Sequence, residues 1–186
     1  MSGQAPLRMT QNDLAAIEQV LDVLGQDPVT VVELGTHRGG TARWLHGQLG
    51  DRIRYFGVEN LSESGATEEP PFDGADLILG CTDDLTVLGR IPPEIHLLLV
   101  DACHCPHHVI LDFVIYGSRI PPGGVVIFHD TEKSRQGLDQ GYQCIMGGSR
   151  LGVLKGMDLL GIGSDPRWEL IVESSGVYGV TAYRRV

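Results

Sequence analysis

Short apolar segments alternate with helix-like segments along most of this chain, and this alternation limits the possible fold more than any other feature. The run "VTVVEL" at 29–34 is continuous and β-branched, as in strands that are covered on both faces. "EIHLLLVDA" at 94–102 is the most hydrophobic run, and "VVIFHDT" at 125–131 follows one helix later. Strands that alternate with helices predict a mostly parallel, doubly wound α/β sheet.

The remaining segments complete this picture. A helix over 10–25, capped by Thr10 or Asn12, would bury one apolar face. We predict further strands at 52–60 and 75–80, helices at 41–49, 83–89, 106–119 and 149–161, and a terminal hairpin within 168–185. The fold class is therefore a Rossmann-like, doubly wound, mostly parallel seven-stranded sheet with a C-terminal antiparallel hairpin strand.

The chain of 186 residues suits one domain. Within residues 1–186 we expect an N-terminal helix segment (1–28), a cofactor-binding core (29–130), an active-site loop (131–148) and a final helix with the terminal hairpin (149–186). The loop 131–148 has four glycines among polar residues, and an acidic loop is predicted at 61–74.

The charge and the cysteine content limit the partners. A net charge of −10 disfavours binding to nucleic acid and to anionic membranes, and no apolar run is long enough to cross a bilayer. The N-terminus lacks the apolar core of a signal peptide, and four cysteines form no dense framework. We therefore expect a cytoplasmic, reduced protein that binds small molecules.

The glycine-rich turn after the first strand, "VVELGTHRGGT", does not fit two common phosphate-binding motifs. A Walker loop would require a lysine between Gly40 and Thr41, and a dinucleotide fingerprint would require glycine where His37 stands. In the simplest alternative, Gly35 and Gly39 only form a tight turn.

Two acids remain at this end of the predicted sheet. Glu33 precedes the turn and suits an ammonium group, whereas Glu59 ends the second strand, where a carboxylate can accept hydrogen bonds from ribose hydroxyls. An amine together with a ribose describes S-adenosylmethionine better than a nucleoside triphosphate. The turn therefore predicts an S-adenosylmethionine site.

Polar residues also gather where two later strands end. Asp101 ends the most hydrophobic strand, and His129 and Asp130 end the neighbouring one. The carboxyl ends of parallel strands meet at one edge of a sheet, so these side chains can converge on one point. Two carboxylates with an imidazole suit a divalent ion that keeps open positions for a substrate.

Four stretches between residues 31 and 131 resemble, in this order, a known family: "VVELGTHRGGT", "YFGVEN", "LLLVDACHCPHHVILDF" and "PPGGVVIFHDT". The chain resembles the class I S-adenosylmethionine-dependent methyltransferases. More narrowly, it is similar to the small metal-dependent O-methyltransferases that include macrolide-sugar methyltransferases and cephalosporin-hydroxylase-like proteins. The resemblance implies methyl transfer to a hydroxyl of a small metabolite, of sugar or natural-product type, by an enzyme that can be a homo-oligomer.

The resemblance also implies roles for single residues. Asp101 and Asp130 would hold Mg²⁺, and His104 would remove the hydroxyl proton. Where His129 stands, relatives often have an acid, and a nitrogen ligand favours ions such as Mn²⁺. The expected cofactor site comprises Glu33, Gly35, Thr36, Gly39, Glu59, Asn60, Cys81, Thr82, Asp83 and Asp101, with Cys81 to Asp83 near the adenine. Asp83 could instead cap the next helix.

Other interpretations compete with these. A structural zinc site at Cys103 and Cys105 is disfavoured, because one intervening residue is not the usual ligand spacing and no second cysteine pair exists. We expect both cysteines to be packing residues, with His107 and His108 on an exposed helical turn. Alternative functions are a non-catalytic S-adenosylmethionine-binding scaffold protein and a metal-dependent hydrolase that uses the same carboxylates.

Overall fold

The computed structural model describes residues 9–25, 27–61, 66–141, 144, 148 and 150–186. Three expectations fall partly outside these residues: the start of the N-terminal segment (1–8), the middle of the acidic loop (62–65), and part of the active-site loop together with the first residue of the last predicted helix (142–143, 145–147 and 149).

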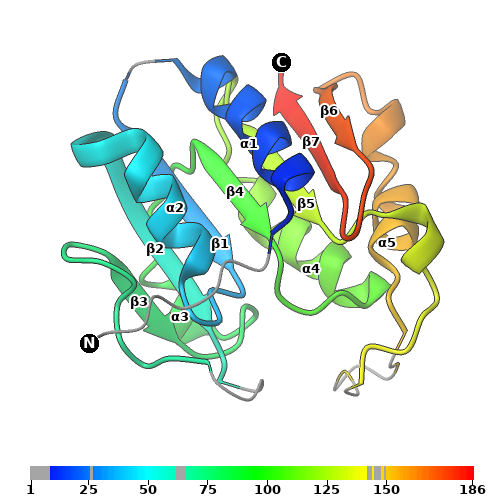
Figure 1. The fold of residues 1–186 in the computed structure, drawn as a ribbon, viewed down its shortest axis with the longest axis horizontal. Coiled ribbons are helices and arrows are strands. Elements are labelled where there is room, and N and C mark those ends of the chain that lie inside the picture. The colour runs from blue at the N-terminus through cyan, green and yellow to red at the C-terminus, as the bar shows by residue number, and fades with distance from the viewer. Residues whose placement is uncertain (1–8, 26, 62–65, 142–143, 145–147, 149) are drawn as a thin grey trace.

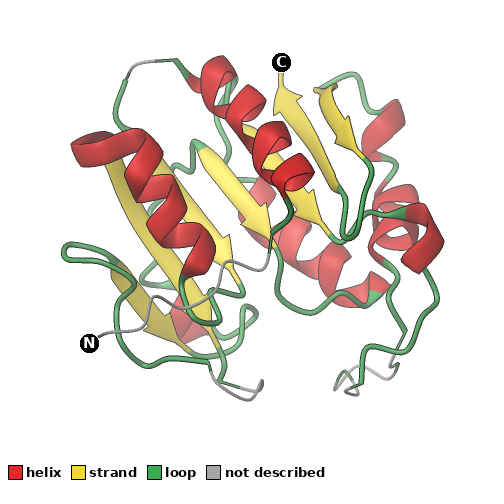
Figure 2. Ribbon diagram, in the orientation of Figure 1, coloured by secondary structure: helices red, strands yellow, loops and turns green. Residues whose placement is uncertain are grey.

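A single seven-stranded sheet forms the centre of the fold, with helices on both faces (Figures 1 and 2). Its strands are β1 (Val29–Leu34), β2 (Ile53–Glu59), β3 (Asp76–Leu79), β4 (Leu97–Val100), β5 (Val125–His129), β6 (Trp168–Ser174) and β7 (Val180–Arg185). The order is β3-β2-β1-β4-β5-β7-β6; the first five strands are parallel, and β7 is antiparallel to both β5 and β6. The predicted fold class is confirmed.

The helices lie where the apolar periodicity places them, with small shifts at their ends. They are α1 (Gln11–Leu24), α2 (Gly40–Leu49), α3 (Leu85–Leu88), α4 (Pro106–Gly117) and α5 (Val153–Leu160), with 3₁₀ turns η1 (Gly50–Arg52), η2 (Lys133–Arg135) and η3 (Ile162–Ser164). Thr10, not Asn12, caps α1, in a reciprocal box with Asp13. The helix α5 begins later than predicted, because the backbone of Gly152, its N-cap, is not helical.

Alternate residues of the central strands pack on opposite faces of the sheet, which explains their unbroken apolar runs. Val31 and Leu99 pack on the side of α1 and α2, whereas Val32 and Val100 pack on the side of α4 and α5. Burying each such side chain stabilises the fold by roughly 1.5–3 kcal/mol. The sheet is therefore a rigid base for the residues at the strand ends.

The strand order reverses between β1 and β4, and such a switch point is where open α/β sheets bind ligands. Gly35 lies here with φ of +90°, and a Cβ atom at this position would be 2.2 Å from the Asp101 carbonyl oxygen. The two strand ends can approach this closely only because residue 35 has no side chain. In the described part of the chain, no helix has the length and apolar character needed to span a membrane.

Candidate active site

A cavity of about 650 Å³ opens at the carboxyl ends of β1, β2, β4 and β5, a size typical of small-molecule sites. Gly39, at the start of α2, is not among the residues that line it. The other expected site residues all line this cavity: Glu33, Gly35, Thr36, Glu59, Asn60, Cys81, Thr82, Asp83, Asp101, His104, His129 and Asp130.

The glycine turn after β1 is fixed against the end of β2. The N–H groups of Gly35 and Thr36 donate to the Val58 carbonyl at 2.9 and 3.2 Å. The buried Glu59 carboxylate accepts from the His37 N–H at 2.6 Å and from the Leu61 N–H at 2.8 Å. A carboxylate has about four acceptor positions, so about two remain for hydroxyl groups of a ligand.

Glu33 is buried on β1 and lines the same cavity. Its carboxyl group accepts hydrogen bonds from the hydroxyls of Tyr55 and Thr41. Burial outweighs these bonds and raises the pKa of Glu33 to about 8. At neutral pH this side chain is therefore mostly protonated until a cation comes near it.

The cavity continues along the segment after β3, which contains Cys81, Thr82 and Asp83. Asp84, not Asp83, caps α3, because its carboxylate accepts from the Thr86 N–H at 2.7 Å. The Tyr116 hydroxyl of α4 donates to the Thr82 carbonyl at 2.6 Å and so holds this segment against the helix.

Two acids and two histidines converge where β4 and β5 end. The Asp101 Oδ1 atom lies 3.0 Å from His129 Nδ1 and 3.2 Å from His104 Nε2. Asp130 Oδ2 lies 3.3 Å from His129 Nδ1 and 3.4 Å from His104 Nε2. These four side chains, here called the acid–imidazole cluster, lie as close together as the sequence predicts.

The carboxylates and imidazoles of the cluster shift one another's pKa values. Burial alone would raise the pKa of Asp101 and lower that of His129, but their mutual attraction outweighs it. The pKa of Asp101 is therefore well below its usual range, and the pKa of His129 is well above its own. Burial also disfavours the charged form of His104, yet the hydrogen bond and charge of Asp101 and the charge of Asp130 raise its pKa. His104 therefore holds a proton more readily than a free imidazole does, and its neutral form, the form that can act as a base, is favoured as the pH rises.

Two residues of this site were not found from the sequence. The Arg135 guanidinium of η2 is hydrogen-bonded to Asp130 Oδ1 and lies 4.7 Å from the ring centroid of Tyr178. The Tyr178 ring, in the turn of the β6–β7 hairpin, is 5.6 Å from the ring of His129. Asp130 has φ of +58°, a strained conformation for a non-glycine residue, which is common at functional sites.

The expectation of two exposed histidines at the start of α4 is half wrong. His107 is exposed, but His108 is buried, with Nδ1 at 2.9 Å from the Sγ atom of Cys144. Successive residues of a helix point to different sides, so His107 can face solvent while the next residue, His108, faces the interior.

A doubly wound sheet of this order, with a cavity at its switch point and acids ending β1 and β2, defines the class I methyltransferase architecture. The protein family described as "Methyltransferase domain" matches residues 32–131, over half of the chain. The chain therefore belongs to this family and is an S-adenosylmethionine-dependent methyltransferase.

Similar solved structures agree with this fold. An O-methyltransferase from Bacillus cereus in complex with SAH is 16% identical, with a TM-score of 0.64 over 98% of this chain and 84% of that one. A putative rRNA-methylase from Clostridium thermocellum is 13% identical, with a TM-score of 0.66 over 96% and 98% of the two chains. No curated protein matches the sequence.

A third similar structure is the MycE methyltransferase from the mycinamycin biosynthetic pathway, in complex with Mg, SAH and mycinamycin VI. It is 18% identical, with a TM-score of 0.62, and the match covers 96% of this chain but only 50% of MycE. At these identities the likeness concerns the fold.

Proposed function

We propose that this methyltransferase transfers its methyl group to a hydroxyl oxygen of a small metabolite, of sugar or natural-product type, with His104 as the general base. The observation that supports this most directly is the position of His104. Its Nε2 atom lies between Asp101 and Asp130 in the same cavity as Glu33 and Glu59. The base and the proposed cofactor contacts therefore face one space.

The reaction would proceed in one displacement. The substrate oxygen attacks the methyl carbon of S-adenosylmethionine, the carbon–sulfur bond breaks, and S-adenosylhomocysteine leaves with the electron pair on sulfur. The neutral form of His104, with Nε2 unprotonated, accepts the hydroxyl proton, and the carboxylates of Asp101 and Asp130, at 3.2 and 3.4 Å from Nε2, then stabilise the imidazolium. Holding the oxygen, methyl group and sulfur in line supplies much of the rate acceleration. Transfer of a labelled methyl group to such a hydroxyl compound tests the proposal.

The acidic composition supports a small acceptor over RNA. A net charge of −10 repels a phosphate backbone, which contributes most of the affinity of nucleic-acid-binding proteins. The cavity of about 650 Å³ is large enough for a sugar-sized or natural-product-sized group beside part of the cofactor. MycE, a protein of similar fold, is seen with mycinamycin VI. Methyl transfer to a small molecule is therefore favoured.

For the cofactor, we propose that Glu59 accepts from the ribose hydroxyls and that the carboxylate of Glu33 faces the ammonium group. Glu59 has acceptor positions left after its two backbone bonds. Glu33 would change from protonated to ionised when a cation arrives, because its pKa of about 8 reflects burial and not a fixed partner charge.

This assignment predicts a pH-dependent cofactor affinity. Below pH of about 8, binding must displace a proton from Glu33, so affinity should rise by up to about tenfold per pH unit and level off above that pH. Calorimetric titrations in buffers of different ionisation enthalpy would detect the released proton. The Glu33→Gln variant should lose this component of the pH dependence, and an identical pH profile in wild type and variant would refute the role of Glu33.

The acid–imidazole cluster also fits a divalent ion. Donor atoms of Asp101, His104 and Asp130 all lie within 4.8 Å of one another. With His104 acting as the base, the carboxylates of Asp101 and Asp130 would be the ligands, and oxygen donors suit Mg²⁺ or Mn²⁺. An ion held by Asp101 and Asp130 would supply Lewis-acid activation of the substrate hydroxyl. Arg135 already binds one oxygen of Asp130, which leaves Oδ2 toward the cluster.

The metal proposal has its own expected result. Mn²⁺ or Mg²⁺ should raise the turnover of chelator-treated wild type by about tenfold or more, since Lewis-acid stabilisation is worth several kcal/mol. The Asp130→Asn variant should lose this stimulation but keep its cofactor affinity, because Asp130 lies away from the ends of β1 and β2. Equal rates with and without a chelator would contradict the metal proposal. Arg135 and the two histidines would then balance the negative charge of the carboxylates without an ion.

A further inference from the structure

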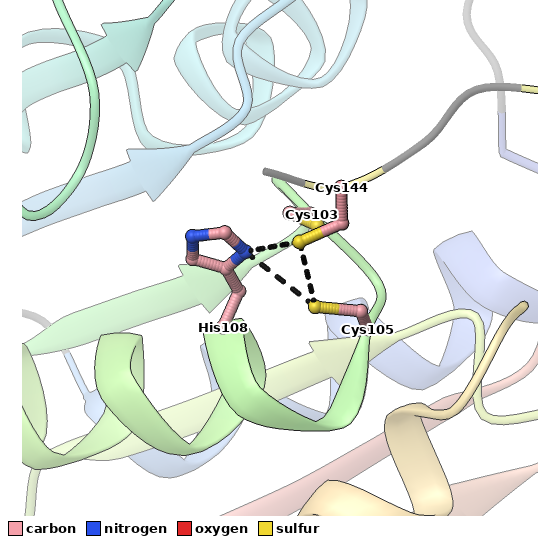
Figure 3. A group of neighbouring side chains, drawn as sticks. All are labelled: Cys103, Cys105, His108 and Cys144. Carbon is pink, nitrogen blue, oxygen red and sulfur yellow. Dashed lines mark hydrogen bonds between the residues drawn. The ribbon is translucent and has the colours of Figure 1, made fainter. Parts of the chain in front are cut away.

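A second group of potential ligands lies beside the active site, and the proposed reaction does not use it. Cys103, Cys105, His108 and Cys144 each offer one ligand atom, and these four atoms all lie within 4.8 Å of one another. We call these four residues the Cys–His cluster; Figure 3 shows Cys105, His108 and Cys144 pointing toward one another, with Cys103 close to Cys144 in this view.

The distances within the Cys–His cluster are short. Cys105 Sγ is 3.1 Å from Cys144 Sγ and 3.5 Å from His108 Nδ1, and His108 Nδ1 is 2.9 Å from Cys144 Sγ (Figure 3). Ligand atoms around a tetrahedral zinc ion are about 3.5–3.8 Å apart, given Zn–S of about 2.3 Å and Zn–N of about 2.0–2.1 Å. Shifts of less than about 1 Å would therefore bring them to a zinc-binding geometry.

Local structure prepares three of the four ligands. Cys105 is the N-cap of α4 and Pro106 follows at the first helical position, so Cys105 and His108 stand three residues apart on one side of the first turn. Cys103 lies just before them, after the end of β4. Cys105 and His108 are buried, which removes most of the mobility that would weaken metal binding.

The fourth ligand comes from a distant part of the sequence. Cys144 lies 39 residues after Cys105, in the segment between η2 and α5, and it is buried against the start of α4. The sequence contains no second cysteine pair, but one downstream cysteine can complete a set of four ligands with His108. Three thiols and one imidazole without a carboxylate are a soft donor set.

From this geometry we propose that Cys103, Cys105, His108 and Cys144 bind a structural Zn²⁺ ion. Four protein ligands leave no open position, so the ion would be structural and not catalytic. It would bind three thiolates, with their protons released to solvent. The ion would tie Cys144 to the turn between β4 and α4, which also contains His104. This site is independent of the proposed O-methylation.

Metal content and cobalt spectroscopy of the reduced, full-length protein test this site. Wild type should retain about one Zn²⁺ per chain after dialysis against a weak chelator. The Co²⁺-substituted protein should show intense tetrahedral d–d absorption together with a thiolate-to-cobalt charge-transfer band. The acid–imidazole cluster contains no sulfur and cannot give that band, so the spectrum separates the two sites without any substitution.

Variants locate the ion. Cys144→Ser should weaken Zn²⁺ affinity at least about tenfold, since even the loss of a group that only supports a ligand has that effect. The control Cys81→Ser removes an exposed cysteine outside the Cys–His cluster and should keep the full Zn²⁺ content, as should Asp130→Asn. The proposal would be overturned if reduced wild type bound no Zn²⁺, if cobalt bound without the charge-transfer band, or if mass spectrometry of protein isolated without oxidant found Cys105 and Cys144 joined in a disulfide.

Discussion

Replacing His104 with alanine is expected to lower kcat for methyl transfer by about 100- to 10,000-fold, the usual contribution of a positioned general base. The Kd for S-adenosylmethionine should stay unchanged, because the proposed cofactor contacts, Glu33 and Glu59, lie at the ends of other strands. The carboxylates of Asp101 and Asp130 raise the pKa of the His104 imidazole. In the alanine variant this imidazole is absent, so no group remains there to accept the hydroxyl proton. Steady-state kinetics together with calorimetry measure both quantities.

His107 provides the matched control for this experiment. It lies three residues later, on the exposed side of the first turn of α4, and it does not line the cavity. His107→Ala should therefore keep both the wild-type turnover and the wild-type cofactor affinity. If His104→Ala also turned over at the wild-type rate, another group must accept the hydroxyl proton, and the assignment of His104 would be wrong.

The second large effect is expected at Gly35. A Cβ atom there would lie 2.2 Å from the Asp101 carbonyl oxygen and 2.8 Å from the Ala102 Cα atom, both of which are main-chain atoms that cannot rotate away. The φ of +90° adds a conformational cost of about 1–2 kcal/mol for a residue with a side chain. Together with overpacking of about 1–3 kcal/mol, Gly35→Ala should lower the free energy of unfolding by about 3 kcal/mol.

Gly47 is the control for this substitution. It lies in the exposed part of α2, and a Cβ atom there would meet nothing within 4 Å. Gly47→Ala should therefore stabilise the protein by up to about 1 kcal/mol through the higher helix propensity of alanine. Urea unfolding curves of both variants would measure the two changes. A Gly35→Ala variant as stable as wild type would show that the ends of β1 and β4 can separate at little cost.

The strands and the residues at their ends could be predicted because both depend on local sequence. Strands buried on both faces read as continuous apolar runs, and the carboxyl ends of parallel strands must meet at one edge. Asp101, His129 and Asp130 end such runs, so their convergence follows from the topology alone. His104, three residues after Asp101, remains within reach of the same edge.

The rest depended on contacts that no local pattern determines. Arg135 reaches Asp130 through the conformation of η2, and Tyr178 reaches His129 through the hairpin turn. Cys144 lies 36 residues after His108 and contacts it in the tertiary structure, with no sequence periodicity that indicates the contact. The sequence disfavoured zinc at Cys103 and Cys105, because only the tertiary structure brings a third cysteine beside them. Residues in such segments are located by long-range packing, which one sequence does not reveal.

Methyl transfer to a small hydroxyl compound can be measured directly. Wild type and His104→Ala would be incubated with methyl-labelled S-adenosylmethionine and, separately, with hydroxylated sugars, natural products and total RNA. The proposed chemistry predicts that wild type labels the oxygen of at least one small molecule, that His104→Ala does so at least about 100-fold more slowly, and that RNA stays unlabelled. Label found in RNA alone would contradict the account.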